Sequence, residues 1–465
     1  MITDSFQGKF EQVQAAIADG PITPRVAPED IRTHLQCRFD FAKPMALDDA
    51  IVAVEEMLKG WQVHVTHPRY FGLFNPSVTF ASTVADSLVA MYNPQLASWR
   101  TSPAANEIEK FTLDWLARKF GLPCETVSNF TNGGAEANLS AVTVALTRSF
   151  PGYGEVGART LHATPAIYLT GEAHHSFSKI AHMSGIGRNA LRKVATDHNL
   201  RMDLTDLAGK IEEDRANGFA PFMVVATAGT TAAGAIDPLP ELGDFCRTHG
   251  LWFHVDAAWG GAAILAPSLR NFLRGIEHAD SVTCDAHKWF SVPMGCGMFF
   301  CRHPENVLEA FRAEAAYMPG KANGAALDPY TSTVQWSRRF IGLKLFLSLV
   351  SHGESGYAEM IEHQSAMGRL LRQLLSDSGW RIVNETQLPL VCFTREGLDI
   401  RKFLACLYDR QIAWMSEAQI RGESVIRACV TSFRTTERDV QQIVEGMNRI
   451  MNVDAALPSV PAECR

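Results

Sequence analysis

From about residue 120 to residue 302, short apolar segments alternate with polar turns and helical patterns. The clearest apolar segments are AIYLT (166–170), FMVVAT (222–227), LWFHVD (251–256) and GMFFC (297–301). Segments that are apolar on both faces and separated by helices are typical of parallel strands covered on both sides. The pattern therefore predicts an α/β fold, with a mostly parallel central sheet and helices on both faces.

The parts of the chain on either side of this alternation have other patterns. Two helical patterns, 28–35 and 47–61, predict an N-terminal helical arm over residues 1–70. Short strands and helices after residue 346 predict a small C-terminal α/β domain over 346–465. A large domain would then cover residues 71–345.

A long segment without a clear apolar face interrupts the rhythm at residues 311–333. It is rich in Ala, Gly, Pro, Asn and Thr, so we expect a long loop of the kind that often closes over an active site. The following segment, SRRFIGLKLFLSLVSHG (337–353), predicts a helix.

Charge and cysteine content exclude several classes of protein. The formal net charge of −7 gives no reason to expect a nucleic acid or an anionic membrane as partner. The polar N-terminus resembles neither a signal peptide nor a transit peptide, and the longest apolar run (341–350) is too short to span a bilayer and carries Lys344. Ten scattered cysteines without a C-x-x-C pair predict reduced thiols, so we expect a cytoplasmic protein.

Two charged residues stand at the ends of apolar strands. Lys288, in SVTCDAHKWF, is either a surface lysine at a strand end or a buried, reactive one. Asp256, in HVDAAWGG, either caps the next turn or meets a cation, because a carboxylate there is removed from water. The small residues Ala257 and Ala258 leave room for something flat, which favours the second interpretation of Asp256.

A glycine pair and a histidine cluster complete the candidate chemistry. Gly133 and Gly134 precede a helical pattern, and backbone N–H groups at such a helix start can bind an anion. His174, with His175 and His182 nearby, could suggest a metal, but no second cluster supplies further ligands and H-E-x-x-H is absent. We therefore expect no metal site.

Together these residues form a set suited to pyridoxal 5′-phosphate. The helix start would hold the phosphate, and the aspartate would keep the pyridine nitrogen protonated so that the ring withdraws electrons. The lysine would form the Schiff base with the cofactor, because burial and a nearby cation lower the pKa of a lysine.

The motifs, in this order, resemble the group II pyridoxal-phosphate-dependent amino acid decarboxylases, which include glutamate, cysteine sulfinate and aromatic L-amino acid decarboxylases. The resemblance runs from HPRYFG (67–72) to RACVTSFRTTERD (427–439). HVDAAWGG and ATAGTTAAGAIDPL (226–239) resemble the glutamate and cysteine sulfinate enzymes, whereas WRTSPA (99–104) resembles the aromatic branch. The resemblance implies a PLP-dependent aspartate-aminotransferase-like fold (fold type I) and a homodimer with its active site at the subunit interface.

The resemblance also implies a role for each matching residue. Lys288 would bind the cofactor covalently, Asp256 would pair with the pyridine nitrogen, and His174 and Ala258 would lie on opposite faces of the ring. Tyr317, on the long loop, would be the catalytic proton donor. The remaining cofactor contacts would be Gly133, Gly134, Ala135, Thr231, Asp285 and His287, and the substrate contacts Phe71, Phe74, Trp99 and Arg427.

This chain departs from the family pattern beside the lysine and at the glycine turn. Asp285 and Ala286 stand where the family commonly has Asn-Pro, and an ionised carboxylate cannot donate the hydrogen bond that an amide would give a phosphate. Ala135 replaces a serine of some members. Phe71 and Phe74 stand where acidic-substrate relatives carry a polar pair, so an aromatic or bulky apolar L-amino acid is the expected substrate.

Three alternatives remain beside simple decarboxylation of an aromatic amino acid. One is an oxidative enzyme on the same scaffold that releases an aldehyde, ammonia and peroxide; a tyrosine at 317 rather than phenylalanine argues against it. Another is decarboxylation of an acidic amino acid. The last is a non-catalytic relative, against which the full set of Lys, Asp, His and Tyr argues.

Overall fold

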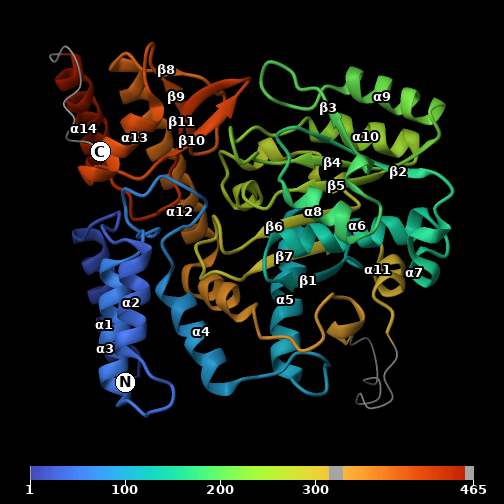
Figure 1. Cartoon of the computed structure of the whole chain (residues 1–465). Helices are drawn as coiled ribbons and strands as arrows, with labels where there is room; N and C mark the ends of the chain where they lie inside the picture. Colours follow the sequence, from blue (N-terminus) through green and yellow to red (C-terminus); the bar gives the residue numbers. More distant parts are fainter. Residues whose placement is uncertain (1, 314–327, 456–465) are drawn as a thin grey trace. The chain divides into compact units, whose positions relative to one another are not determined.

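The computed structural model describes residues 2–313 and 328–455 (Figure 1). It contains two compact units, which we describe separately. Unit 1 consists of residues 1–77, 366–383 and 391–465, and unit 2 of residues 78–365 and 384–390. The expected three-part division at residues 70 and 345 stays a prediction.

Unit 2 is built on a seven-stranded sheet in the order β1-β7-β6-β5-β4-β2-β3. Its strands are β1 (Val127–Thr131), β2 (Thr164–Thr170), β3 (Leu191–Val194), β4 (Phe219–Thr227), β5 (Trp252–Asp256), β6 (Ser281–Asp285) and β7 (Gly297–Cys301). Only β7 pairs antiparallel, with β1 and β6, while the pairs from β6 to β3 are all parallel. The mostly parallel sheet expected from the apolar segments is confirmed.

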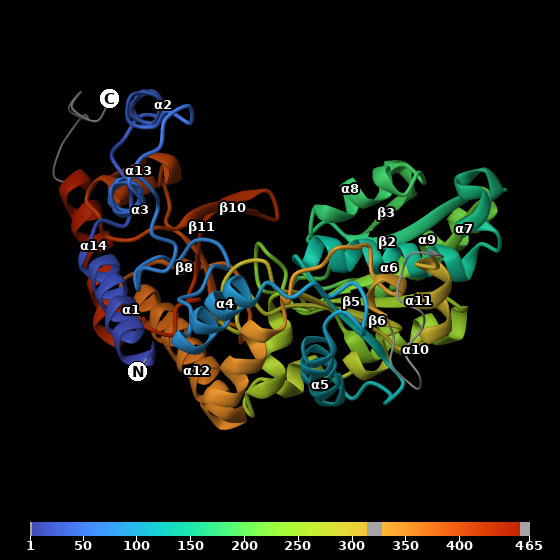
Figure 2. The same ribbon diagram turned by 90° about the horizontal axis from the view of Figure 1, so that it is seen from below.

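Helices cover both faces of this sheet. Helix α6 contacts β4 to β7 on one face, and α10 lies on the opposite face (Figure 2). The helices of unit 2 are α4 (Phe80–Tyr92), α5 (Pro103–Lys119), α6 (Gly134–Ser149), α7 (Tyr153–Val156), α8 (Ser176–Met183), α9 (Leu204–Ala216), α10 (Leu239–His249), α11 (Pro304–Ala310) and the first part of α12 (Leu343–Asp377). Short 3₁₀ segments occupy Gly157–Thr160, Arg188–Ala190, Gly260–Leu265, Arg270–Leu273, Ile276–His278 and Pro329–Thr331.

Local sequence signals explain several of these boundaries. The side chain of Asp203 accepts hydrogen bonds from two backbone N–H groups at the start of α9, and the side chain of Thr79 accepts one from the backbone N–H of Ser82 at the start of α4. Helix α10 ends at Gly250, which adopts a left-handed conformation with φ of 67°. That conformation favours glycine, which explains why the helix ends there.

The helix expected at 337–353 is wrong at its start, because α12 begins at Leu343. Its expected end is confirmed, because Gly353 has a non-helical backbone (φ 66°) and separates this helix from a second one that runs on to Asp377. Residues 338–342 are held outside the helix by a buried carboxylate. The guanidinium of Arg338 and the backbone N–H of Gly342 both donate to Glu109. The apolar pattern is continuous across this segment, so it could not reveal the competing contacts.

Unit 1 contains a four-stranded sheet in the order β10-β11-β9-β8. Its strands are β8 (Arg381–Ile382), β9 (Leu390–Thr394, which begins at the end of unit 2), β10 (Ser416–Ile420) and β11 (Glu423–Cys429). Helices α13 (Ile400–Asp409) and α14 (Glu437–Ala455) contribute Leu407 and Ile443 to one buried cluster with Val430. The small α/β arrangement expected in this part of the chain is therefore present.

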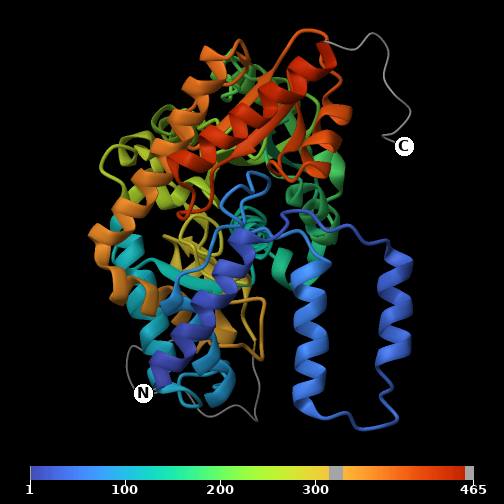
Figure 3. The same cartoon turned by 90° about the vertical axis from the view of Figure 1, so that its left-hand side faces the viewer.

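The N-terminal segment of unit 1 is helical, as predicted. It forms α1 (Ile2–Asp19), α2 (Pro28–Arg38) and α3 (Leu47–Gly60). Figure 3 shows α2 and α3, in blue, as antiparallel helices joined at one end by residues 39–46. Large apolar side chains on α3, among them Leu47 and Val52, are exposed. Within the described residues no helix combines the length and apolar content needed to cross a bilayer.

Candidate active site

Polar residues gather where three adjacent parallel strands of unit 2 end. Thr227 is the last residue of β4, Asp256 of β5 and Asp285 of β6. In the strand register, Asp256 lies between Thr227 on β4 and Thr283 on β6. The carboxyl edge of a parallel sheet is the usual place for a ligand site in an α/β fold, so the two predicted carboxylates stand where such a site is expected.

The carboxylate of Asp256 is buried and held by two donors. Its Oδ1 accepts from the backbone N–H of Ala258 at 3.1 Å, and its Oδ2 accepts from Nδ2 of Asn138 at 2.9 Å. Only 4% of Asp256 is exposed. Donors of this kind stabilise the ionised form against the cost of burial, so the group can pair with a protonated ring nitrogen.

The glycine turn before α6 lies directly against the other site residues. A Cβ on Gly134 would stand 2.9 Å from Oδ2 of Asp285 and 3.3 Å from the Cβ of Ala258. A Cβ on Gly133 would stand 3.2 Å from Cε1 of His287. A larger residue at either position would fill the space in front of the turn. Glycine leaves this space open, so an anion can approach the backbone N–H groups at the start of α6.

Lys288 is close to the cradle and only partly buried. Its Nζ lies 3.1 Å from Oδ2 of Asp285, and 21% of its side chain is exposed. Oδ1 of Asp285 is buried without a hydrogen-bond partner among the described residues, and the same holds for Oγ1 of Thr227 and of Thr283. Buried polar atoms without partners are rare in folded proteins, so these three atoms mark a place suited to a polar ligand.

Two histidines near the lysine have defined partners. Nδ1 of His287 accepts from the backbone N–H of Cys296 at 3.1 Å, and burial lowers the pKa of His287. Nδ1 of His174 accepts from the backbone N–H of Ser176 at 3.2 Å and lies 2.9 Å from Oγ of Ser176. His174 is exposed at the rim, and partial removal from water lowers the pKa of its imidazole.

The donor set fits pyridoxal 5′-phosphate. A helix start with two glycines suits the phosphate, a buried carboxylate suits the protonated pyridine nitrogen, and an accessible lysine suits the aldehyde. The carboxylate of Asp285 is the one unusual member, because it lies beside the glycine turn where a phosphate brings further negative charge. Its contact with Lys288 places a cation next to it.

Several predicted residues lie outside this cluster. Ala135 and Thr231 are exposed. Phe71, Phe74 and Arg427 belong to unit 1, where the guanidinium of Arg427 donates to the carbonyl of Gly72 and lies 4.8 Å from the ring centre of Phe74. Tyr317 falls outside the described residues. The roles of all these residues stay predictions.

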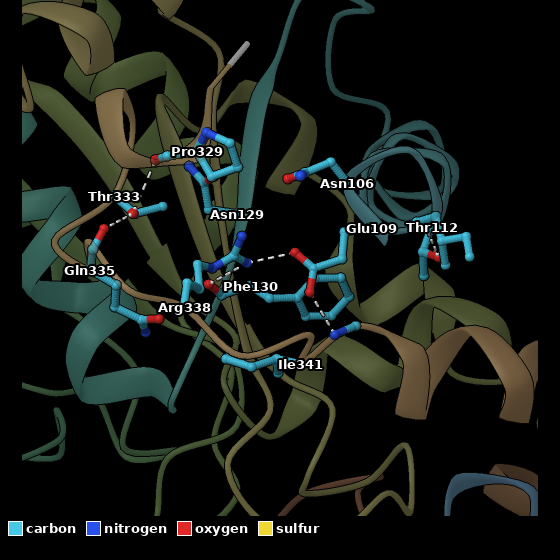
Figure 4. A network of polar contacts seen from close by, with 12 residues as sticks. Asn106, Glu109, Thr112, Asn129, Phe130, Pro329, Thr333, Gln335, Arg338 and Ile341 are labelled. Carbon is cyan, nitrogen blue, oxygen red and sulfur yellow. Dashed lines mark hydrogen bonds and ion pairs between the residues drawn. The ribbon is translucent and has the colours of Figure 1, made fainter. Parts of the chain in front are cut away.

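Trp99 lines a different cavity of unit 2. This cavity of about 350 Å³ also involves Asn106, Glu109 and Arg338 and includes none of the predicted cofactor residues. The indole of Trp99 donates to Glu107 at 2.7 Å. Figure 4 shows the polar network beside it, in which Arg338 and Glu109 form a buried ion pair at 2.7 Å.

Sequence reasoning missed Asn138 and Ser176, which contact the predicted Asp256 and His174. It also missed His254, which contacts Asn138. His254 precedes Asp256 by two positions and therefore lies on the same face of β5. Asn138 follows Gly134 by about one helical turn. Both spacings are visible in the sequence, but neither identifies a partner without the packing of α6 on the sheet.

Comparison with known proteins identifies the family. The Pyridoxal-dependent decarboxylase conserved domain matches residues 28–396. The chain belongs to this family. It is therefore a pyridoxal-phosphate-dependent carboxy-lyase, and the predictions of family, cofactor and fold type are confirmed.

Individual relatives agree with this assignment. The chain is 29% identical over 394 residues to an aromatic-L-amino-acid decarboxylase from Bacillus atrophaeus, covering 82% of this chain and 80% of the relative. The structure of Catharanthus roseus tryptophan decarboxylase in complex with L-tryptophan is similar at a TM-score of 0.85 and 25% identity, covering 97% and 99% of the two chains. Rhodiola rosea 4-hydroxyphenylacetaldehyde synthase is similar at a TM-score of 0.86 and 25% identity, covering 97% of each chain.

Proposed function

We propose that this decarboxylase acts on an aromatic or bulky apolar L-amino acid and releases CO2 and the corresponding amine. The observation that carries the proposal is the meeting of Lys288, Asp256 and the Gly133–Gly134 turn at one edge of the sheet. The names of the relatives, which act on aromatic amino acids or tryptophan, support the substrate class.

Each residue of the cluster has a proposed task. Lys288 would bind the cofactor covalently, and Asp256 would pair with its pyridine nitrogen. The Gly133–Gly134 turn would hold its phosphate, and His174 would contact its ring. Bound pyridoxal phosphate supplies the electron-withdrawing ring that lets the carboxylate leave as CO2.

The proton that replaces CO2 at Cα is proposed to come from Tyr317. This role rests on the family resemblance, because Tyr317 lies outside the described residues. A donor shielded from water would transfer its proton to Cα without competition from solvent. A second donor candidate within the cluster is His174, which can position the ring or relay a proton.

The apolar substrate preference rests on the family resemblance, which predicts Phe71, Phe74 and Arg427 as substrate contacts. Phe71 is fully buried and Phe74 is 9% exposed, so neither offers a partner to a side-chain carboxylate. Arg427 is already engaged by Gly72 and by the ring of Phe74. A substrate with an acidic side chain would bury a charge without a matched partner, which is costly.

A homodimer is proposed as the working form, with the active site at the subunit interface. Exposed apolar residues on α3, such as Leu47, Val52 and Leu58, support an interface there, because apolar side chains gathered on one helix usually mark a contact surface. A cytoplasmic location is likewise proposed, because the ten cysteines are scattered along the sequence without a C-x-x-C pair.

The second candidate function is oxidative decarboxylation and deamination, which consumes O2 and water and yields an aldehyde, CO2, ammonia and hydrogen peroxide. The similarity to 4-hydroxyphenylacetaldehyde synthase is the observation that favours it. Tyrosine at position 317 favours the simple decarboxylase instead. On this reasoning Tyr317→Phe should raise the yield of peroxide relative to CO2.

A panel of amino acids tests the proposal. Full-length protein with added pyridoxal phosphate should release CO2 fastest from aromatic substrates, without peroxide. Faster release from glutamate, aspartate or cysteine sulfinate than from any aromatic amino acid would overturn the substrate class, and peroxide equal to CO2 would establish the second candidate. Lys288→Ala should abolish turnover, whereas Lys193→Ala, which changes an exposed lysine of β3, should leave it intact.

A further inference from the structure

A chain of hydrogen bonds runs beneath α6 from the start of β5 to the carboxylate at its end. Its distances are 2.8 Å from Nε1 of Trp252 to Oγ of Ser281, 2.9 Å from Ser281 Oγ to Nδ1 of His254, 3.0 Å from His254 Nε2 to Oδ1 of Asn138, and 2.9 Å from Asn138 Nδ2 to Oδ2 of Asp256. All five residues are buried. Trp252, His254 and Asp256 alternate along β5, so they share the face that α6 covers.

The two end residues of this series of hydrogen bonds, Trp252 and Asp256, fix the direction of every bond in it. An indole N–H only donates, and an ionised carboxylate only accepts. Asn138 must therefore turn its amide NH2 toward Asp256 and its oxygen toward His254. His254 then donates from Nε2 and accepts at Nδ1 from Ser281, whose oxygen accepts from Trp252.

The neutral state of His254 agrees with this direction. Its side chain is fully buried, and this burial lowers the pKa of His254 to about 4. A neutral imidazole carries one proton, and Asn138 requires that proton on Nε2. Each residue along the chain thus has one allowed orientation, which ends in an N–H that points at Asp256.

Asn138 also links this chain to the histidine at the rim. Its Nδ2 lies 3.5 Å from Oγ of Ser176, which lies 2.9 Å from Nδ1 of His174. Because Nδ1 of His174 also accepts from the backbone N–H of Ser176, the imidazole proton stays on Nε2 when the ring is neutral. One side chain therefore touches both networks.

We propose that Asn138 is a positioning residue that orients the carboxylate of Asp256 toward the cofactor nitrogen and, through its contacts with His254 and Ser176, couples that orientation to both networks. The proposal rests on the roles of Lys288 and Asp256 proposed above. Removal of the amide leaves the buried carboxylate with the backbone N–H of Ala258 as its remaining donor, so the carboxylate is held less firmly in the orientation that suits a protonated pyridine nitrogen.

A cofactor analogue separates this role from a merely structural one. The probes are pyridoxal 5′-phosphate and the analogue in which C–H replaces the ring nitrogen, each titrated into full-length apoprotein by absorbance. The wild type should prefer the natural cofactor. Asn138→Ala should reduce that preference by about 10- to 100-fold, the range expected for one hydrogen bond to a charged group. A loss of packing alone would weaken both ligands equally.

His254→Phe tests the same chain without changing Asn138 and remains informative if Asn138→Ala does not fold. It should reduce the preference in the same direction, and the double variant should be no worse than Asn138→Ala alone. The matched control is Asn106→Ala, which removes a buried amide that donates to two backbone carbonyls of unit 2. This variant should keep the wild-type preference for pyridoxal 5′-phosphate over the analogue.

The outcomes separate the two proposals. An unchanged preference, within about twofold, in both Asn138→Ala and His254→Phe would overturn the role of Asn138. A wild type that binds both probes equally would instead overturn the role of Asp256. If the Lys288→Ala variant showed the same absorbance change on cofactor binding as the wild type, the assignment of Lys288 would be overturned.

Discussion

The buried ion pair between Glu109 and Arg338 allows a stability prediction with a defined magnitude and pH dependence. The side chains are 5% and 2% exposed, and the guanidinium also donates to the carbonyl of Phe130 at 3.1 Å. Burial raises the pKa of Glu109, while Arg338 and the backbone N–H of Gly342 oppose that rise. Arg338→Met removes the cation and leaves the carboxylate with the Gly342 N–H at 2.8 Å.

An uncompensated buried charge is the main cost of this substitution. Removing one partner of a buried pair costs about 3–5 kcal/mol in the free energy of unfolding at neutral pH. The variant can lower this cost by protonating Glu109, so the pKa of Glu109 rises further above its ordinary value of 4.5. A carboxyl group whose pKa is higher in the folded state destabilises the fold as the pH rises above the unfolded value. The difference from wild type should therefore be smallest near pH 5 and largest near pH 8.

Urea unfolding followed by circular dichroism at pH 5 and pH 8 measures this difference. Glu109→Gln combined with Arg338→Met should recover most of the lost stability at pH 8, because no buried charge remains. The matched control is Arg339→Met. The side chain of Arg339 is 53% exposed and pairs with Asp86, so this substitution should cost less than about 1 kcal/mol in the free energy of unfolding. A loss below about 1 kcal/mol for Arg338→Met at pH 8, or a loss that does not change with pH, would refute the reasoning.

Two further predictions concern the cofactor site. Gly134→Ala should raise the dissociation constant of pyridoxal phosphate by about 5- to 150-fold, because the added Cβ would meet Asp285 and overpacking of this kind costs about 1–3 kcal/mol. An absorbance titration measures this constant. The control is Gly209→Ala, because a Cβ at Gly209 would meet open space. Asp256→Asn should lower kcat by about 10²- to 10³-fold, the range seen when a preorganised electrostatic partner is lost. A CO2-release rate for that variant within tenfold of wild type would contradict the proposed pairing with the ring nitrogen.

The strands of unit 2 were predictable because their signal is local. Each is a short apolar run between turn residues, and Asp256 and Asp285 end two of them in the sequence as in the structure. Parallel pairing then brings such strand ends to one edge without further information. The start of α12 was not predictable, because it depends on Glu109, which lies more than two hundred positions away in the chain.

The partners of the site residues required the folded structure. Asn138 reads as an ordinary polar residue of an amphipathic helix, and only the packing of α6 on β5 shows that its amide meets Asp256 and His254. Trp99 shows the opposite case: the motif that contains it is specific, yet its indole contacts Glu107 in a cavity without any predicted cofactor residue.

Three histidines illustrate how the surroundings of one residue type determine what it can do. His254 uses both ring nitrogens within the protein, so it can orient its neighbours but cannot reach a ligand. His287 accepts at Nδ1 from Cys296 and turns Nε2 toward Asp285, 3.7 Å away. The hydrogen bonds of His174 among the described residues fall on Nδ1, which leaves Nε2 at the exposed rim for a ligand. Of these three, His174 is therefore the histidine whose chemistry remains available to a substrate, and this follows from its partners rather than from its residue type.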